Sequence, residues 1–350
     1  MRTPTGPEAS AAEPLVCICV PTYNAAATLR ETLQSILAQT YHNFVLKVCD
    51  NASTDDTVLI AESFTDPRLR VYRSAVNQGA EANFTRCIQL GCGRYTAIFH
   101  ADDIYEKTMV ARQVAFMDDH ADVGAVFTRA STIDEHGVVF GALGGSPVAT
   151  GEGGVSRLNF EALLRAMLLH HNFLVCPSAM ARTELYRDKI GSWGDRGFRS
   201  AADVDVWLRL AREQDIAILE EPLMRYRISA AQYSHLNRNR TERADFFLVM
   251  DHYVREPSVR DLLRAGDLRH LRWLERHDRV ARAINLYGAG KVQAARDLLH
   301  GTLGTDAFAA ARATRRGMVT LAAIALLRAL LLTGSGGAGL ARAAKRIAWR

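Results

Sequence analysis

The stretch L-V-C-I-C-V-P-T-Y-N, residues 15–24, decides the fold class of this chain. Its six apolar residues end at Pro21 and are typical of a strand buried on both faces, as in a parallel sheet. A second apolar run, Phe44 to Cys49, ends at Asp50. Between the runs, the capping-box pattern Thr28 to Glu31 precedes apolar residues at helical spacing. These features predict a strand–helix–strand unit.

The same alternation continues along the chain. Short apolar runs predict strands at 69–72, 95–99 and 124–128, and helical spacing predicts helices at 56–64, 80–90, 107–119, 158–169, 203–213 and 231–253. This order predicts an α/β fold with a mostly parallel, doubly wound sheet flanked by helices, whose ligands bind at the carboxyl ends of the strands. The glycine-rich segment 136–154 predicts a mobile loop or lid.

The 350 residues include 48% hydrophobic and 23% charged residues, which excludes a disordered or fibrous chain. The net charge of +5 is too small to indicate a nucleic-acid partner. It is unevenly spread, because Arg264 to Arg350 holds 16 basic and 5 acidic residues. We predict a flexible leader at 1–13, an acidic α/β domain at 14–255 and a basic, all-helical C-terminal region at 256–350.

The six cysteines all lie in the first 176 residues and form no C-x-x-C pair. We interpret them as buried thiols in a reducing compartment. The first 13 residues contain no continuous apolar stretch that would serve as a signal peptide. A cytoplasmic location is therefore expected.

Polar clusters follow three predicted strands: Pro21 to Asn24, Asp50 to Thr57, and His100 to Asp103. A fourth, Ala202 to Trp207, opens a later helix. Adjacent carboxylates repel one another unless a cation neutralises them, and a hard divalent cation that carries a diphosphate does so through oxygen ligands. The clusters therefore predict a nucleoside-diphosphate site.

From about residue 15 to residue 234, the sequence resembles the family 2 glycosyltransferases. The resemblance rests on six elements in the expected order: V-P-T-Y-N, V-C-D-N-A-S-T-D-D-T, N-Q-G-A-E-A-N, F-H-A-D-D, A-D-V-D-V-W and P-L-M-R-Y-R. It implies a GT-A fold, in which a Rossmann-like sheet binds a nucleotide sugar.

The resemblance also implies roles for single residues. Asp50 would contact the base or ribose, and the nucleotide-sugar pocket would be lined by Pro21, Thr22, Tyr23, Asn24, Asn77, Gly79, His100, Ala101, Asp102 and Arg227. Asp102, with Asp103 beside it, would bind Mg²⁺ or Mn²⁺, and Asp203 would be the general base. His100 replaces a common aspartate and would contact ribose or metal, while Arg227 either contacts the diphosphate or simply ends a strand.

The implied reaction is an inverting in-line displacement, in which the sugar leaves its nucleoside diphosphate for a hydroxyl of a sugar or lipid-linked acceptor. It would serve the synthesis of a cell-surface polysaccharide or glycolipid. Two alternatives are a sugar nucleotidyltransferase and a catalytically degenerate nucleotide-sugar-binding module. Asp55 and Asp56 are interpreted as helix caps, and Trp207 either stacks on a sugar or packs in the core.

The apolar segment Met318 to Thr333 has 16 residues and contains Arg328. Spanning a bilayer takes about 20 apolar residues, so we do not expect a transmembrane helix. Two interpretations stay open: burial in a C-terminal helical bundle, or peripheral contact with the inner face of the cell membrane through the basic residues on both sides of the segment.

Overall fold

The computed structural model describes residues 15–148, 151–228, 240–304 and 315–332. The predicted leader and residues 231–239 of the predicted helix at 231–253 lie outside these residues. In the described remainder, residues 240–245 are not helical, and the helix begins at Phe246. Two compact units divide the chain. Unit 1 comprises Met1–Phe160, Phe173–Gly197 and Val206–Arg227, and unit 2 comprises Glu161–Asn172, Phe198–Asp205 and Ile228–Arg350. The domain boundary predicted near residue 255 stays a prediction.

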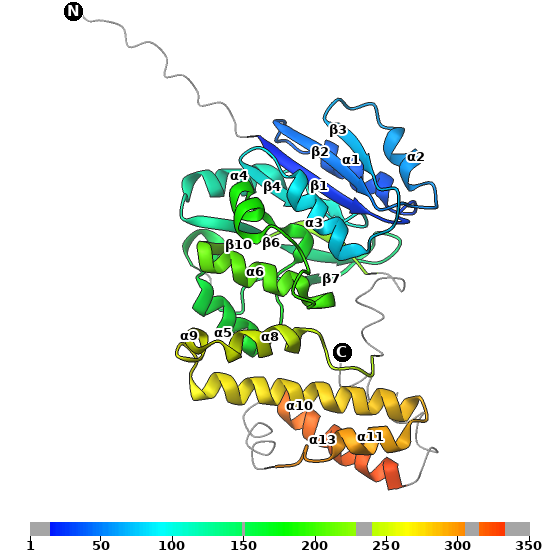
Figure 1. Ribbon diagram of the computed structural model, residues 1–350, viewed down its shortest axis with the longest axis vertical. Coiled ribbons are helices and arrows are strands. Elements are labelled where there is room, and N and C mark those ends of the chain that lie inside the picture. Colours follow the sequence, from blue (N-terminus) through cyan, green and yellow to red (C-terminus); the bar gives the residue numbers. More distant parts are fainter. Residues whose placement is uncertain (1–14, 149–150, 229–239, 305–314, 333–350) are drawn as a thin grey trace, which may run out of the picture. The chain divides into compact units, whose positions relative to one another are not determined.

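Unit 1 is built on one sheet of ten strands (Figure 1). Its strands are β1 Val16–Thr22, β2 Phe44–Asp50, β3 Leu69–Arg73, β4 Tyr95–Ile98, β5 Ile104–Tyr105, β6 Val123–Ile133, β7 Val139–Leu143, β8 Val155–Leu158, β9 Met180–Arg182 and β10 Asp215–Arg227. The main order is β3-β2-β1-β4-β9-β6-β10-β5, with β7 on β6 and β8 on β10. The mixed α/β architecture expected from the sequence is confirmed.

The first half of the sheet, β3-β2-β1-β4, is wholly parallel. In the second half only β6 and β10 run parallel, and the short strands β5, β7, β8 and β9 add antiparallel pairs. Strand β7 corrects the prediction of a loop or lid at 136–154. Val138, Val139 and Phe140 have the branched or aromatic side chains that favour strands.

The long helices α1 Leu29–Leu37, α3 Ala80–Leu90 and α4 Met109–Asp119, with the shorter α2 Thr57–Glu62, follow the first strands as predicted. The apolar face of α1 places Leu29, Leu33 and Ile36 in the core, where each is fully buried. Three short helices, η1 Glu152–Gly154, η2 Cys176–Ser178 and η3 Leu185–Ile190, complete the connections.

Unit 2 is helical in its described part. Helices α5 Phe160–His170 and α6 Ala202–Glu213 each have residues in both units, and the others are η4 Arg199–Ala201, α8 Phe246–Arg255, α9 Pro257–Arg260, α10 Ala265–Gly288, α11 Val292–Leu299 and α13 Arg315–Leu332. Ile324, Leu327 and Leu331 of α13 pack in one core with α10 and α11. This packing supports the bundle interpretation of the apolar segment. None of the described helices has the length and apolar character needed to cross a membrane.

Candidate functional site

The loops after β1 and β2 are linked to each other. The parallel register places Thr22 opposite Asp50 and Pro21 opposite Cys49. Beyond the strand ends, the Asn24 amide donates to Ser53 Oγ at 3.0 Å, and Asn24 Oδ1 accepts from the Thr54 amide at 2.8 Å. Side-chain bonds therefore hold the two loops side by side.

Asp50 lies at the base of these loops and is 2% exposed. Its Oδ2 accepts from the Ser53 amide at 3.1 Å, and its Oδ1 accepts from Thr22 Oγ1 at 3.5 Å. Asp50 and Arg73 line a surface hollow of about 420 Å³. Tyr23, in contrast, is 49% exposed. Asp50, which the sequence analysis expects to contact the nucleotide, thus lines an open surface hollow.

Asn51 is a residue that the sequence analysis did not single out. Its Nδ2 donates to Asn77 Oδ1 at 2.9 Å and to the Gly79 carbonyl at 3.0 Å, and its Oδ1 accepts from the Gln78 amide at 3.0 Å. Gly79 has a φ of +89°, which glycine adopts at little cost. Asn51 therefore fixes the predicted N-x-G turn against the end of β2. The sequence did offer one indication of this role, because Asn51 directly follows Asp50 at the end of a predicted strand.

The F-H-A-D-D segment follows β4 and forms an acidic corner of His100, Asp102 and Asp103. One ligand atom from each of the three lies within 4.8 Å of the others. Asp103 Oδ1 accepts from the Arg227 amide at 2.9 Å. Asp103 Oδ2 and His100 Nε2 are buried and have no hydrogen-bond partner among the described residues. Among the described residues, these two buried atoms are therefore available as ligand atoms.

Burial sets the protonation of this corner. Desolvation, followed by the charge of Asp102, raises the pKa of Asp103 well above its usual value. Desolvation also lowers the pKa of His100, so the imidazole is neutral and able to ligate. A buried carboxyl of this kind ionises readily only beside a cation. The donor set of two carboxylates and one neutral imidazole fits a divalent metal ion.

The predicted capping box at Thr28 and Glu31 is wrong. No side chain caps the start of α1. Instead, Thr28 Oγ1 and Thr32 Oγ1 donate to the Ala101 carbonyl at 2.9 and 3.0 Å. The first turn of α1 therefore holds the backbone of the acidic corner in place.

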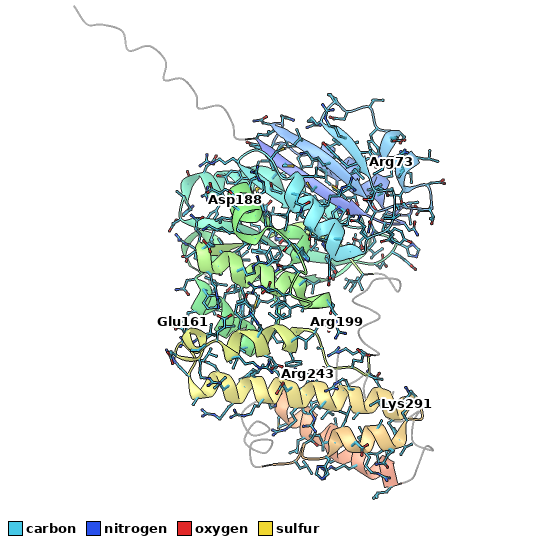
Figure 2. All side chains as sticks on the ribbon, viewed as in Figure 1. Arg73, Glu161, Asp188, Arg199, Arg243 and Lys291 are labelled. Carbon is cyan, nitrogen blue, oxygen red and sulfur yellow. The ribbon has the colours of Figure 1, made fainter. Side chains whose placement is uncertain are left out.

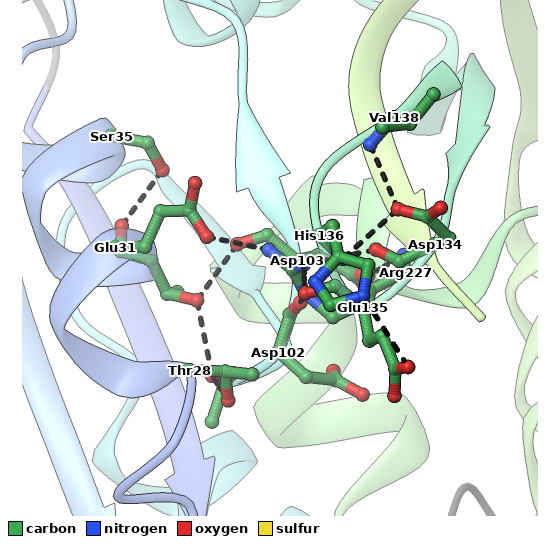
Figure 3. Close-up of polar contacts among 12 residues, drawn as sticks. Thr28, Glu31, Ser35, Asp102, Asp103, Asp134, Glu135, His136, Val138 and Arg227 are labelled. Atoms are coloured by element: carbon green, nitrogen blue, oxygen red, sulfur yellow. Dashed lines mark hydrogen bonds and ion pairs between the residues drawn. The ribbon is translucent and has the colours of Figure 1, made fainter. Parts of the chain in front are cut away.

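Arg227, the last residue of β10, is surrounded by acceptors (Figure 3). Its guanidinium donates to the carbonyls of Asp102, Asp134 and Glu135 at 2.9–3.2 Å and meets Glu31 Oε2 at 2.5 Å. The side chain is 6% exposed. In this structure Arg227 ties the acidic corner to α1 and to the turn after β6, and its contact with a diphosphate stays a prediction.

Asp203 belongs to unit 2. Its Oδ2 accepts from Asn172 Nδ2 at 2.9 Å, and its Oδ1 accepts from the Val204 amide at 2.8 Å. It lines a pocket of about 550 Å³, together with His171 and with Arg199 and Arg243, which Figure 2 labels. Burial raises the pKa of Asp203 to about 6, despite these hydrogen bonds. A carboxylate with this pKa is a stronger base than a solvated one.

Two open interpretations are settled by packing. Trp207 is 1% exposed and lies edge-on to Phe127 and Trp193, so it is a core residue. Asp55 accepts from the Thr57 amide at 3.0 Å at the start of α2, as expected of a cap, whereas Asp56 makes no side-chain cap bond.

Comparison with known proteins bears on the identity of the chain. The profile described as Glycosyl transferase family 2 matches residues 17–188. The Bacillus subtilis protein EpsE, which its name assigns to the glycosyltransferases, is 30% identical over 203 residues, which are 57% of this chain and 68% of EpsE.

A second relative is Escherichia coli WfaP, named as a UDP-Glc:alpha-D-GlcNAc-diphosphoundecaprenol beta-1,3-glucosyltransferase. It is 34% identical over 104 residues, which are 30% of this chain and 41% of WfaP. Among solved structures, Staphylococcus aureus TarS in complex with UDP-GlcNAc has a TM-score of 0.59 at 17% identity and covers 88% of each chain. That similarity bears on the fold, which it identifies as GT-A. The chain belongs to the family 2 glycosyltransferases and is a glycosyltransferase enzyme.

Proposed function

We propose that this enzyme transfers a sugar from a nucleoside-diphosphate sugar to a hydroxyl acceptor, with a divalent metal ion and with inversion at the anomeric carbon. The observation that carries the proposal is the acidic corner, where Asp103 Oδ2 and His100 Nε2 are buried without partners among the described residues. The corner follows β4, which is the neighbour of β1 in the sheet. Asp50 and the loops after β1 and β2 would take the nucleoside.

His100, Asp102 and Asp103 would hold Mg²⁺ or Mn²⁺. When bound, such an ion stabilises the negative charge of the departing diphosphate. Arg227 and Thr28 would position the corner, because they bind the backbone carbonyls of Asp102 and Ala101. These hydrogen bonds would hold the backbone of the three metal-binding residues in place before the nucleotide sugar binds.

Asp203 would be the general base that takes the proton of the acceptor hydroxyl. Its pKa of about 6 keeps it ionised at neutral pH, and its pocket of about 550 Å³ has room for an acceptor sugar. Asn172 donates to Oδ2 and would orient the carboxylate. A positioned base of this kind typically accelerates transfer by about 10²–10⁴-fold.

The names of the relatives suggest the first substrates to test. WfaP is named for UDP-glucose and for a diphosphoundecaprenol-linked acceptor. We propose a role in cell-surface polysaccharide or glycolipid synthesis, at the cytoplasmic face of the membrane. Peripheral attachment would use the exposed residues of α13, of which Met318 is 58% and Leu332 87% exposed, and the basic residues that flank the helix in the sequence.

The decisive experiment screens nucleotide sugars, beginning with UDP-glucose and UDP-GlcNAc, for release of the nucleoside diphosphate with Mn²⁺ or with EDTA. We expect slow hydrolysis of one donor with Mn²⁺ and none with EDTA. Full turnover in EDTA would refute the metal role. For attachment, we expect the protein to sediment with anionic but not with neutral liposomes at low salt, and sedimentation with neither would refute it.

A further inference from the structure

Four of the six cysteines lie together where β1, β2 and α3 meet, and Cys92 continues the row from Cys17. Cys17 and Cys19 are on β1, Cys49 is on β2, and Cys87 is on α3, and all four are fully buried. All are free thiols. The Sγ atoms of Cys19, Cys49 and Cys87 lie within 4.8 Å of one another. This thiol cluster is separate from the acidic corner and has no part in the transfer reaction proposed above.

The spacing of the thiol cluster suits a thiolate-bound metal ion. Zinc–sulfur bonds are about 2.3 Å long, which places three sulfurs around one ion about 4 Å apart. Movements of less than 1 Å within the 4.8 Å limit would therefore close the site. The three residues come from three different elements, so an ion bound to them would join β1, β2 and α3.

Two positive side chains lie near the thiol cluster. Hydrogen bonds from Cys19 and Cys87, together with the charges of Arg86 and Lys47, outweigh burial and hold the pKa of Cys49 below its usual value. Hydrogen bonds from neighbouring thiols and burial raise the pKa of Cys19, and burial raises that of Cys87, so a bound metal ion must displace the protons of these two thiols. Thiolates rather than thiols bind metals. Arg86 and Lys47 would also offset part of the negative charge that thiolates bring into a buried site.

A row of thiols offers a route to the surface. Cys17 Sγ is 3.8 Å from Cys19 Sγ and is hydrogen-bonded to the Cys92 thiol. Cys92 is only partly buried, and Lys47 Nζ donates to its sulfur at 3.4 Å. An ion that exchanges from one thiolate to the next would pass from Cys92 through Cys17 to the thiol cluster.

We propose that Cys19, Cys49 and Cys87 bind one soft, thiophilic metal ion, with Zn²⁺ and Cu⁺ as the biological candidates. Soft thiolate ligands select such ions, whereas the carboxylates of the acidic corner select hard ones. The ion would brace the wall of the nucleotide pocket, because Cys49 directly precedes Asp50. Asn83 of α3 already donates to the Cys49 carbonyl at 2.8 Å.

The test titrates the reduced full-length protein with Cd²⁺ and records the ultraviolet thiolate-to-metal charge-transfer band. Carboxylate ligands give no such band, so ions at the acidic corner do not contribute. The variants are Cys87→Ala and Cys49→Ser, and the matched control is Cys176→Ala, the one cysteine outside the row. Circular dichroism checks that each variant is folded.

We expect the wild type and Cys176→Ala to bind one equivalent of Cd²⁺ with a rise in Tm, and Cys87→Ala and Cys49→Ser to lose the band. Cys92→Ala should reach the same stoichiometry more slowly. A wild-type protein without the band overturns the proposal even if a variant fails to fold. A folded Cys87→Ala or Cys49→Ser protein that keeps the full band, or a control that loses it, also overturns it.

Discussion

Asp103 and Asp203 are both aspartates whose pKa values burial raises, yet their surroundings prepare them for different tasks. Asp103 has one oxygen bound by an amide and one buried oxygen without a partner among the described residues. Asp203 has both oxygens hydrogen-bonded and lines an open pocket. The first arrangement suits the proposed metal ligand, and the second suits the proposed general base. The number of hydrogen-bonded oxygens, rather than burial alone, distinguishes the two proposed roles.

The largest expected effect is that of Asp203→Asn, which removes the proposed base and keeps the shape of the side chain. We expect kcat to fall by about 10²–10⁴-fold, while nucleoside diphosphate binding is unchanged. Asp122→Asn, at an aspartate that is 67% exposed and does not line this pocket, is the control and should leave kcat unaltered. Wild-type turnover in Asp203→Asn would remove Asp203 from the mechanism.

Asp103→Asn tests the other carboxylate. The loss of one charged ligand contact costs about 1.5–3 kcal/mol, so the Mn²⁺ concentration for half-maximal activity should rise about 10- to 100-fold. Asp56→Asn is the matched control, because Asp56 is an exposed aspartate that makes no side-chain cap bond and lies outside the acidic corner. An unchanged Mn²⁺ dependence in Asp103→Asn would contradict the metal role.

Arg227 and Glu31 form a pair in which only one partner is buried, with side chains 6% and 55% exposed. Arg227→Met leaves three backbone carbonyls without their charged donor and should lower the free energy of unfolding by about 3–5 kcal/mol in urea titrations. Glu31→Gln removes only the exposed partner and should cost about 1 kcal/mol or less. If the free energy of unfolding falls equally in the two variants, the backbone hydrogen bonds of Arg227 do not stabilise the acidic corner.

The smallest effect concerns pH. Because Asp203 acts as a base only when ionised, kcat should rise with pH through about 6. Asn172→Ala removes a hydrogen bond to the charged form, so the midpoint of this rise should move upward by roughly 0.5–1 pH unit. A profile of kcat against pH measures both. If the midpoint does not change in Asn172→Ala, the group that titrates in the kcat profile is not Asp203.

The sequence predicted the parallel half of the sheet well, because its strands are short, mainly apolar segments that alternate with helices of clear periodicity. It missed β5, β8 and β9, which have two to four residues and are too short to show a pattern. It also gave no range for the long strand β10, whose apolar residues are interrupted by Glu220, Glu221 and Pro222. It also misread Thr28 and Glu31. Local spacing matched a capping box, but their partners Ala101 and Arg227 lie 73 and 196 residues further along the chain.

Four described non-glycine residues have a left-handed backbone: Asn24, Ala52, His171 and Arg199. Asn24 and Ala52 follow β1 and β2, and His171 and Arg199 line the pocket of Asp203. This conformation costs most residues about 1–2 kcal/mol, which glycine does not incur. Glycine should therefore be neutral or stabilising at Ala52, His171 and Arg199, the reverse of its usual effect. In a deep mutational scan that measures protein abundance, glycine should be tolerated at these three positions. Such a scan would therefore reveal the loop after β2 and the pocket of Asp203 without any measurement of activity.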